Sequence, residues 1–194
     1  MKKKIYILLG HPDNKSYCGA LARAYEAGAR EGGHEVRFMS LQDMNFNANL
    51  EHGYNAIQEL EPDLRTFQEN IRWAEHIVLV YPLWWALFPA KLKGLFDRAL
   101  LPGFGYRFHK TDPFWDKLLR GRSARLIVTT NTPSIYYWAF FAGLPGVRVM
   151  KKAILDFCGI GPIRVSVLSR VLRTSQERRE RFMGRIKKLG VAGK

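Results

Sequence analysis

The fold of this 194-residue chain is decided by the stretch IYILLGHPDNKSYC, residues 5–18. Its continuous apolar run at 5–9 is typical of a strand that is buried on both faces, as in a parallel sheet. Residues 16–31 follow with the spacing of an amphipathic helix, and Gly32 and Gly33 end that helix. A strand, a short polar loop and a helix in this order predict the first unit of an α/β protein.

The same alternation continues along the chain. Further strands are predicted at 36–39, 76–81, 126–130 and 165–168, and further helices at 63–74, 88–100, 147–157 and 175–189. This order predicts a single-domain, three-layer α/β sandwich over residues 1–194, with a parallel sheet covered by helices on both faces. For five strands we expect the flavodoxin-like order 2-1-3-4-5, in which ligands bind beyond the carboxyl ends of the strands.

Composition indicates an ordinary soluble globular protein, with 47% hydrophobic and 25% charged residues. The two cysteines, Cys18 and Cys158, lack any CxxC or Cys/His spacing, which disfavours a disulfide scaffold or a metal site and favours a cytoplasmic location. The longest apolar stretch, residues 77–90, contains two prolines and is too short to cross a bilayer.

The net charge of +14 is placed unevenly. Residues 1–116 carry 14 basic and 14 acidic side chains, whereas residues 117–194 carry 17 basic and 3 acidic ones. The basic C-terminal third is either a solvated face, which we favour, or a docking surface for an acidic protein or an anionic membrane. No helix-turn-helix pattern or aromatic-basic recognition motif accompanies it, so nucleic-acid binding is not expected.

The loop after the first strand offers a place for a phosphate. It leads directly into a helix, so the helix N-terminus and the Ser16 hydroxyl would face the ligand, with Lys15 as a counter-charge. A purely structural role, in which Ser16 caps the helix, explains the same residues equally well. Cys18 would be either a reactive thiol at the helix N-terminus or, as we favour, a small packing residue.

Two more loops follow strands that should adjoin this one. Residues 81–89 (YPLWWALFP) place aromatics and prolines directly after a buried strand, where a flat apolar ring could lie, although a core cluster would look similar. Residues 129–138 (TTNTPSIYYW) place hydroxyl groups and then aromatics after the fourth strand. Together the three loops predict a site for a flat, phosphorylated ligand at the carboxyl edge of the sheet.

Several motifs, taken in order, resemble the flavodoxin-like NAD(P)H:quinone oxidoreductases. They span residues 4 to about 165, and their joint pattern is more specific than any single piece. The matching segments are His11 with Ser16-Tyr17, DMNFN at 43–47, YPLWW at 81–85, KGLFDR at 93–98, LPGFGY at 101–106 and FCGI at 157–160.

This resemblance implies a flavin cofactor, FMN or FAD with FMN slightly favoured, and NAD(P)H as the electron donor. It implies phosphate binding by the first loop, stacking of the isoalloxazine on the second, and contact of the third with the ring's other polar edge. The residues so implied are His11, Lys15, Ser16, Tyr17 and Cys18 in the first loop, Pro82, Leu83, Trp84 and Trp85 in the second, and Thr129, Thr130 and Asn131 in the third.

The resemblance also implies the reaction, in which a hydride passes to the flavin and a quinone-like acceptor then takes two electrons by a ping-pong route. Tyr137 or Tyr136 would assist hydride transfer, but Gly143 stands where the mammalian enzyme has its relay histidine. Family members are usually homodimers, so Phe104, Tyr106 and part of 133–146 would face a partner's flavin. The alternatives are an electron-carrier flavodoxin, although carriers are typically acidic, and an accessory subunit of the potassium-efflux type.

Overall fold

The computed structural model describes residues 1–194, with every side chain except that of Ser134. Five parallel strands form the central sheet, and their order is β2-β1-β3-β6-β7. Their bounds are Lys4–Leu9 (β1), Glu35–Ser40 (β2), His76–Pro82 (β3), Ser123–Thr130 (β6) and Ile163–Ser169 (β7). Because β6 and β7 are the fourth and fifth strands of this sheet, the expected order 2-1-3-4-5 is confirmed.

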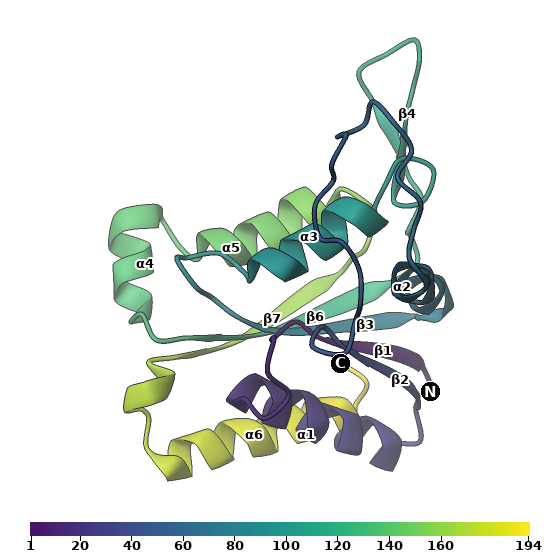
Figure 1. Ribbon diagram of the computed structural model, residues 1–194. Helices are drawn as coiled ribbons and strands as arrows, with labels where there is room; N and C mark the ends of the chain where they lie inside the picture. Colours follow the sequence, from purple (N-terminus) through teal and green to yellow (C-terminus); the bar gives the residue numbers. More distant parts are fainter.

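Helices cover both faces of the sheet, as the alternation predicts (Figure 1). One face carries α1 (Tyr17–Glu31) and α6 (Gln176–Val191). The other face carries α2 (Pro62–Trp73), α3 (Ala90–Ala99) and α5 (Pro145–Arg148), which continues as the π-helical segment η1 (Val149–Asp156). The three-layer flavodoxin-like sandwich is therefore confirmed.

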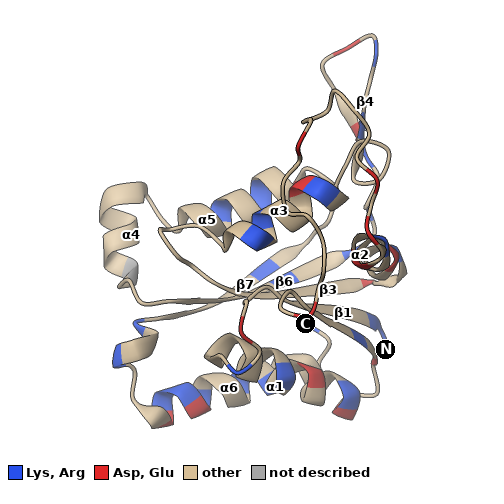
Figure 2. Cartoon of the chain, viewed as in Figure 1, with Lys and Arg blue, Asp and Glu red and all other residues tan. Residues whose placement is uncertain are grey.

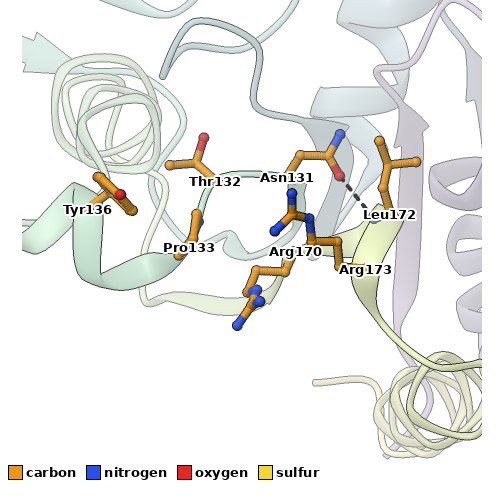
Figure 3. Close-up of a pocket in the computed structure, with 7 residues that line it drawn as sticks. All are labelled: Asn131, Thr132, Pro133, Tyr136, Arg170, Leu172 and Arg173. Atoms are coloured by element: carbon orange, nitrogen blue, oxygen red, sulfur yellow. Dashed lines mark hydrogen bonds between the residues drawn. The ribbon is translucent and has the colours of Figure 1, made fainter.

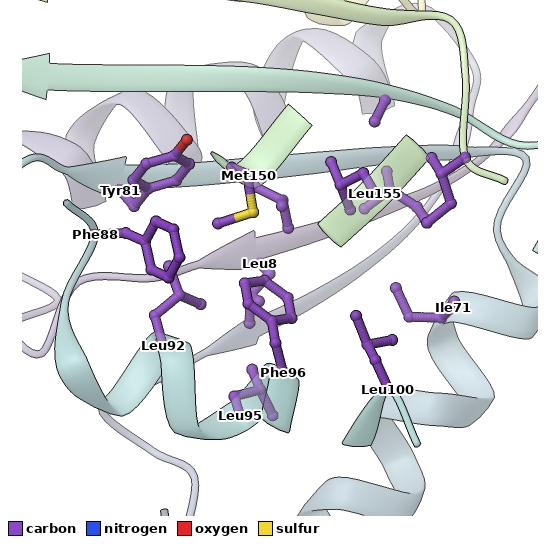
Figure 4. Close-up of a cluster of buried hydrophobic side chains, with 14 of the residues drawn as sticks. Leu8, Ile71, Tyr81, Phe88, Leu92, Leu95, Phe96, Leu100, Met150 and Leu155 are labelled. Carbon is purple, nitrogen blue, oxygen red and sulfur yellow. The ribbon is translucent and has the colours of Figure 1, made fainter. Parts of the chain in front are cut away.

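The inner strands of the sheet, β1, β3 and β6, are buried on both faces, which explains their continuous apolar runs, whereas the edge strands β2 and β7 are partly exposed. In β1, Tyr6 and Leu8 point toward the layer of α2 and α3, whereas Ile5 and Ile7 point toward α1 and α6. Figure 4 shows Leu8 within the first of these clusters, among side chains from β3, α3 and η1. A strand with two buried faces has no position for polar residues, so the pattern lacks the alternation of a half-exposed strand.

Helices α1 and α6 pack unusually closely because glycines lie where they cross. A Cβ atom on Gly28 would lie 2.1 Å from the main-chain oxygen of Lys187, and one on Gly190 would lie 2.3 Å from that of Tyr25. Both distances are far below van der Waals contact, so any larger residue would push the helices apart. The close contact fixes α6 and with it the turn that joins α6 to β7.

Four elements were not predicted from the sequence. They are the hairpin strands β4 (Tyr106–Phe108) and β5 (Trp115–Lys117), helix α4 (Ser134–Phe141) and the 3₁₀ turn η2 (Val171–Arg173). Three-residue strands are too short to show a period, and α4 is apolar around most of its circumference, so it lacks an amphipathic stripe. The helix predicted at 88–100 begins only at Ala90, and the one predicted at 147–157 begins at Pro145 and widens into a π-helical segment.

Helix α6 carries several of the basic residues of the C-terminal third, along the outside of the molecule (Figure 2). Arg178, Arg181 and Arg185 are exposed there. Within the described chain, no helix is both long enough and apolar enough to span a membrane.

Candidate functional site

The three predicted loops meet around a cavity of about 150 Å³ at the carboxyl ends of β1, β3 and β6. Ten of the expected cofactor-binding residues line it, together with two residues of η2, whereas Lys15 and Trp85 do not. The lining residues are His11, Ser16, Tyr17, Cys18, Pro82, Leu83, Trp84, Thr129, Thr130, Asn131, Val171 and Leu172.

The N-terminus of α1 forms one wall of this cavity. The Ser16 hydroxyl caps the helix by accepting a hydrogen bond from the Gly19 N–H at 3.2 Å. The first N–H groups of a helix lack partners within the helix, so those of Tyr17 and Cys18 remain for a ligand. A helix N-terminus with free N–H groups attracts anions, so this wall suits a phosphate.

The loop before α1 is internally bonded. The Asp13 N–H donates to Nδ1 of His11 at 2.9 Å, and the Asp13 carboxylate accepts from the Lys15 N–H at 2.8 Å. The His11 ring packs edge-on against Trp84, with ring centroids 5.5 Å apart, and partial burial lowers the pKa of His11. His11 is therefore a neutral wall of the cavity at pH 7, while the Lys15 side chain is exposed outside it.

The loop after β3 makes a tight turn. Trp84 and Leu87 exchange main-chain hydrogen bonds of 2.8 and 3.0 Å, and the two residues between them, Trp85 and Ala86, have φ angles of 51° and 64°. Left-handed conformations are uncommon outside glycine and concentrate at functional sites. Within the described chain the N–H groups of Trp85 and Ala86 carry no hydrogen bond, and the Trp85 side chain is 99% exposed.

The end of β6 lines the cavity, and the hydroxyl groups of its last two residues contact neighbouring side chains. The Thr129 hydroxyl lies 3.1 Å from the Cys18 sulfur, and the Thr130 hydroxyl lies 3.3 Å from that of Tyr137. Burial raises the pKa of Cys18 to about 11, although the hydrogen bond with Thr129 opposes the shift. Cys18 is therefore a neutral packing residue and not an activated thiol.

The two candidate tyrosines occupy different environments. Tyr137 is buried, with 3% of its surface exposed, whereas Tyr136 on the same helix is 54% exposed. Tyr136 lines a second cavity, of about 550 Å³ (Figure 3). The residues that line this second cavity are Asn131, Thr132, Pro133, Tyr136, Arg170, Leu172 and Arg173. Asn131 and Leu172 therefore belong to both cavities, and the Leu172 N–H donates to Oδ1 of Asn131 at 3.1 Å.

Sequence analysis missed the contribution of the segment after β7. Val171 and Leu172 line the first cavity, and Arg170, Leu172 and Arg173 line the second. No aromatic, proline or glycine marks this segment, whose sequence is SRVLRT at 169–174. The signal that could have revealed it is topological, since the strand beside β6 ends at the same edge of the sheet.

Two residues expected to face a partner's flavin are buried within this chain. Phe104 belongs to the core, and Tyr106 packs edge-on against Phe157 with ring centroids 4.9 Å apart. The exposed aromatics of the hairpin region are Phe108 and Phe114. Among the described residues, no group of three or more His, Cys, Asp or Glu side chains is placed to hold a metal ion.

Comparison with known proteins agrees with this geometry. Residues 3–189 match the family described as having a flavodoxin-like fold. An uncharacterized NAD(P)H oxidoreductase of Haemophilus influenzae is 33% identical over 158 residues, which cover 79% of this chain and 77% of that protein. The human ribosyldihydronicotinamide dehydrogenase [quinone] is 28% identical over 183 residues, covering 81% of this chain and 77% of that protein.

A solved structure shares the fold over the whole chain. The FMN-dependent NADH-azoreductase of Bacillus anthracis, in complex with FMN, superposes with a TM-score of 0.71 at 18% identity. The superposition covers 100% of this chain and 99% of that one. The matched family pattern, the relatives and the arrangement of loops at the carboxyl edge lead to one assignment: the chain belongs to the flavodoxin-like family of NAD(P)H oxidoreductases.

Proposed function

We propose that this protein is a flavin-dependent oxidoreductase that takes a hydride from NAD(P)H and passes two electrons to a quinone or a similar acceptor. The observation that carries the proposal is the cavity where three loops, far apart in sequence, bring together a helix N-terminus, an apolar wall and a polar wall. The names of the Haemophilus and human relatives support the donor and the acceptor.

The residues of the cavity fit a flavin. The N–H groups of Tyr17 and Cys18 would hold its phosphate, and Pro82 and Trp84 would lie against its ring. A bound flavin would supply the hydride chemistry itself, which explains why the cavity holds few acid–base groups. Of the main-chain donors beside the ring, those of Trp85 and Ala86 are free of other partners in the described chain.

The cofactor that we propose is FMN, which the Bacillus anthracis azoreductase also binds. FMN needs one phosphate site, and the N-terminus of α1 supplies one. Release of the cofactor from purified protein, followed by chromatography against FMN and FAD, tests this proposal. Recovery of FAD at one equivalent per chain would contradict it.

Rapid mixing of the flavin-loaded protein with NADPH and with NADH tests the donor reaction. We expect the flavin absorbance to bleach with at least one donor and to return when menadione is added. If neither nucleotide bleaches the flavin, the proposed function is wrong. Bleaching without steady-state turnover of menadione would instead indicate an electron carrier.

We also propose that the protein acts as a homodimer in the cytoplasm. Trp84, Trp85 and Leu87 are among the residues that line a mostly apolar cavity of about 600 Å³. The large side chains of Ile135 and Trp138 on α4 are exposed as well. A second copy of the chain would cover such a surface. Light scattering should show that the wild type is a dimer and that Trp85→Glu shifts the protein toward the monomer. A monomeric wild type would refute the dimer.

An accessory role is favoured by one observation, the row of exposed arginines on α6. These side chains could contact an acidic protein or an anionic membrane. Flotation with vesicles that contain about 30 mol% anionic lipid tests the membrane contact. The assay compares the wild type with a variant neutralised at Arg178, Arg181 and Arg185. Equal flotation of the two proteins would remove that surface from consideration.

A further inference from the structure

Two arginines face the cavity beside the proposed flavin site. Arg170 directly precedes the turn η2 and Arg173 is its last residue. Figure 3 shows both guanidinium groups extending toward the side of the cavity that holds Pro133 and Tyr136. Neither guanidinium forms an ion pair with a described side chain, and no acidic residue is among those that line the cavity. The cavity therefore carries uncompensated positive charge.

The turn that carries this charge is held in place. Arg170 has a φ of 57°, a conformation that costs a non-glycine residue energy and is therefore found where the surroundings impose it. Its main-chain oxygen accepts hydrogen bonds from the Arg173 N–H at 2.9 Å and from the Thr174 hydroxyl at 2.8 Å. The bond from the Leu172 N–H to Asn131 ties the turn to the end of β6.

The chemistry of this cavity selects an anion. The opposite wall comes from residues 126–147, a stretch without any charged residue, so the two arginines dominate the local potential. Guanidinium groups bind phosphate through paired, charge-assisted hydrogen bonds, and two of them match the double charge of a phosphate monoester. Residues 11–18, which form the first phosphate site, do not line this cavity. A phosphate bound here is therefore a different group from the one held by α1.

We propose that Arg170 and Arg173 bind the 2′-phosphate of NADPH and so make the protein select NADPH over NADH. This inference rests on the proposed function, because it places the donor beside the flavin. The cavity shares Asn131 and Leu172 with the flavin cavity, so a dinucleotide whose nicotinamide covers the flavin can extend into it. The other anion that two arginines could hold here is the pyrophosphate of FAD, whose two phosphoryl groups carry one charge each, and the experiment separates the two.

The test compares Arg170→Gln, Arg173→Gln and the double variant with Arg178→Gln. Arg178 is exposed on α6 and lines neither cavity, so its variant removes the same charge from the same region. We expect the double variant to lose about 10- to 100-fold in kcat/KM for NADPH, with NADH changed less than about 3-fold. Arg178→Gln should keep the ratio of the two donors within about 2-fold of the wild type.

A binding measurement makes the test independent of turnover. Calorimetry of the flavin-loaded proteins with adenosine 2′,5′-bisphosphate and with 5′-AMP should show that the wild type prefers the bisphosphate. The double variant should lose that preference. If neither nucleotide donor reduces the flavin, the proposed function fails, and the bisphosphate measurement still decides the role of the arginines.

Three results would overturn the inference. The first is a wild type that uses NADH as well as NADPH and binds both adenosine phosphates equally. The second is an equal loss with both donors in the double variant, which would indicate a structural role. The third is a loss of bound flavin from the double variant, measured by the ratio of flavin to protein, which would assign the arginines to the cofactor's own phosphates.

Discussion

The sulfur of Cys18 lies 3.1 Å from the hydroxyl of Thr129, so one contact joins the first turn of α1 to the end of β6 beneath the cavity. Both residues are buried. Because burial raises the pKa of Cys18 to about 11, the thiol stays neutral at physiological pH and the contact is between two uncharged groups. This pairing positions two walls of the site relative to one another.

Thiol labelling checks the buried state of the cysteines. Burial also raises the pKa of Cys158 to about 11, and both thiols are free. Because the thiolate is the reactive form, we expect neither cysteine of the native protein to react with Ellman's reagent within minutes at about pH 8. Both should react once the protein is denatured in about 6 M guanidinium. One fast-reacting thiol in the native protein would contradict the structure.

Substitution of Gly190 tests the contact between α1 and α6. In Gly190→Ala the new Cβ would lie 2.3 Å from the main-chain oxygen of Tyr25, so we expect a loss of about 2 kcal/mol or more in the free energy of unfolding. Gly184→Ala is the matched control, because no atom lies within 4 Å of its Cβ position on the same helix. That control should raise the free energy of unfolding by up to about 1 kcal/mol, because alanine has a higher helix propensity than glycine. Urea denaturation measures the free energy of unfolding of both variants. If the two variants are equally stable, the helices do not pack closely at Gly190.

The two adjacent tyrosines should respond differently to loss of their hydroxyl groups. Tyr137→Phe removes a buried hydrogen bond to Thr130, so we expect it to lower the free energy of unfolding by about 1 kcal/mol with little effect on turnover. Tyr136→Phe should leave stability within about 0.5 kcal/mol of the wild type. If its exposed hydroxyl assists hydride transfer, turnover should fall by about 10-fold or more. The reverse pattern would assign that role to Tyr137.

The hairpin contains a histidine that responds to pH. His109 lies 2.9 Å from Asp112 and 3.3 Å from Asp116, and hydrogen bonds with Asp116 and then Asp112 raise the pKa of His109 above its ordinary 6.5. A raised pKa means that this contact stabilises the hairpin fully below pH 6.5 and is lost as the pH rises through the raised value. An NMR titration should place the midpoint above 6.5, and Asp116→Asn should lower it. An unchanged midpoint in the variant would show that the pair does not form.

The sheet could be predicted from the sequence because its inner strands are buried on both faces. Residues 5–9 and 76–81 are almost wholly apolar, and the turns and helices that follow them leave one economical topology. That topology predicts that the three loops meet at one edge of the sheet, so most of the lining of the first cavity could also be predicted. The second cavity could not be foreseen, because Arg170 and Arg173 look like any exposed arginines until η2 folds beside Asn131.

Details of the walls also escaped sequence analysis. Thr129 and Thr130 look available for a ligand in the sequence, yet their hydroxyls contact Cys18 and Tyr137. Such pairings depend on side-chain directions between elements that are far apart in the chain. The resemblance implies that Trp85 lies against the ring; its side chain is not among those that line the first cavity and instead lines the apolar cavity with Trp84 and Leu87.

Asn131 has a consequence for how this protein could change over evolution. Its side chain holds η2 through Leu172, and its surface belongs to both cavities. A substitution there would alter the lining of both cavities in a single step, whereas changes at Arg170 or Arg173 alter the second cavity alone. Residues 170 and 173 can therefore vary without changing the lining of the first cavity, whereas residue 131 cannot.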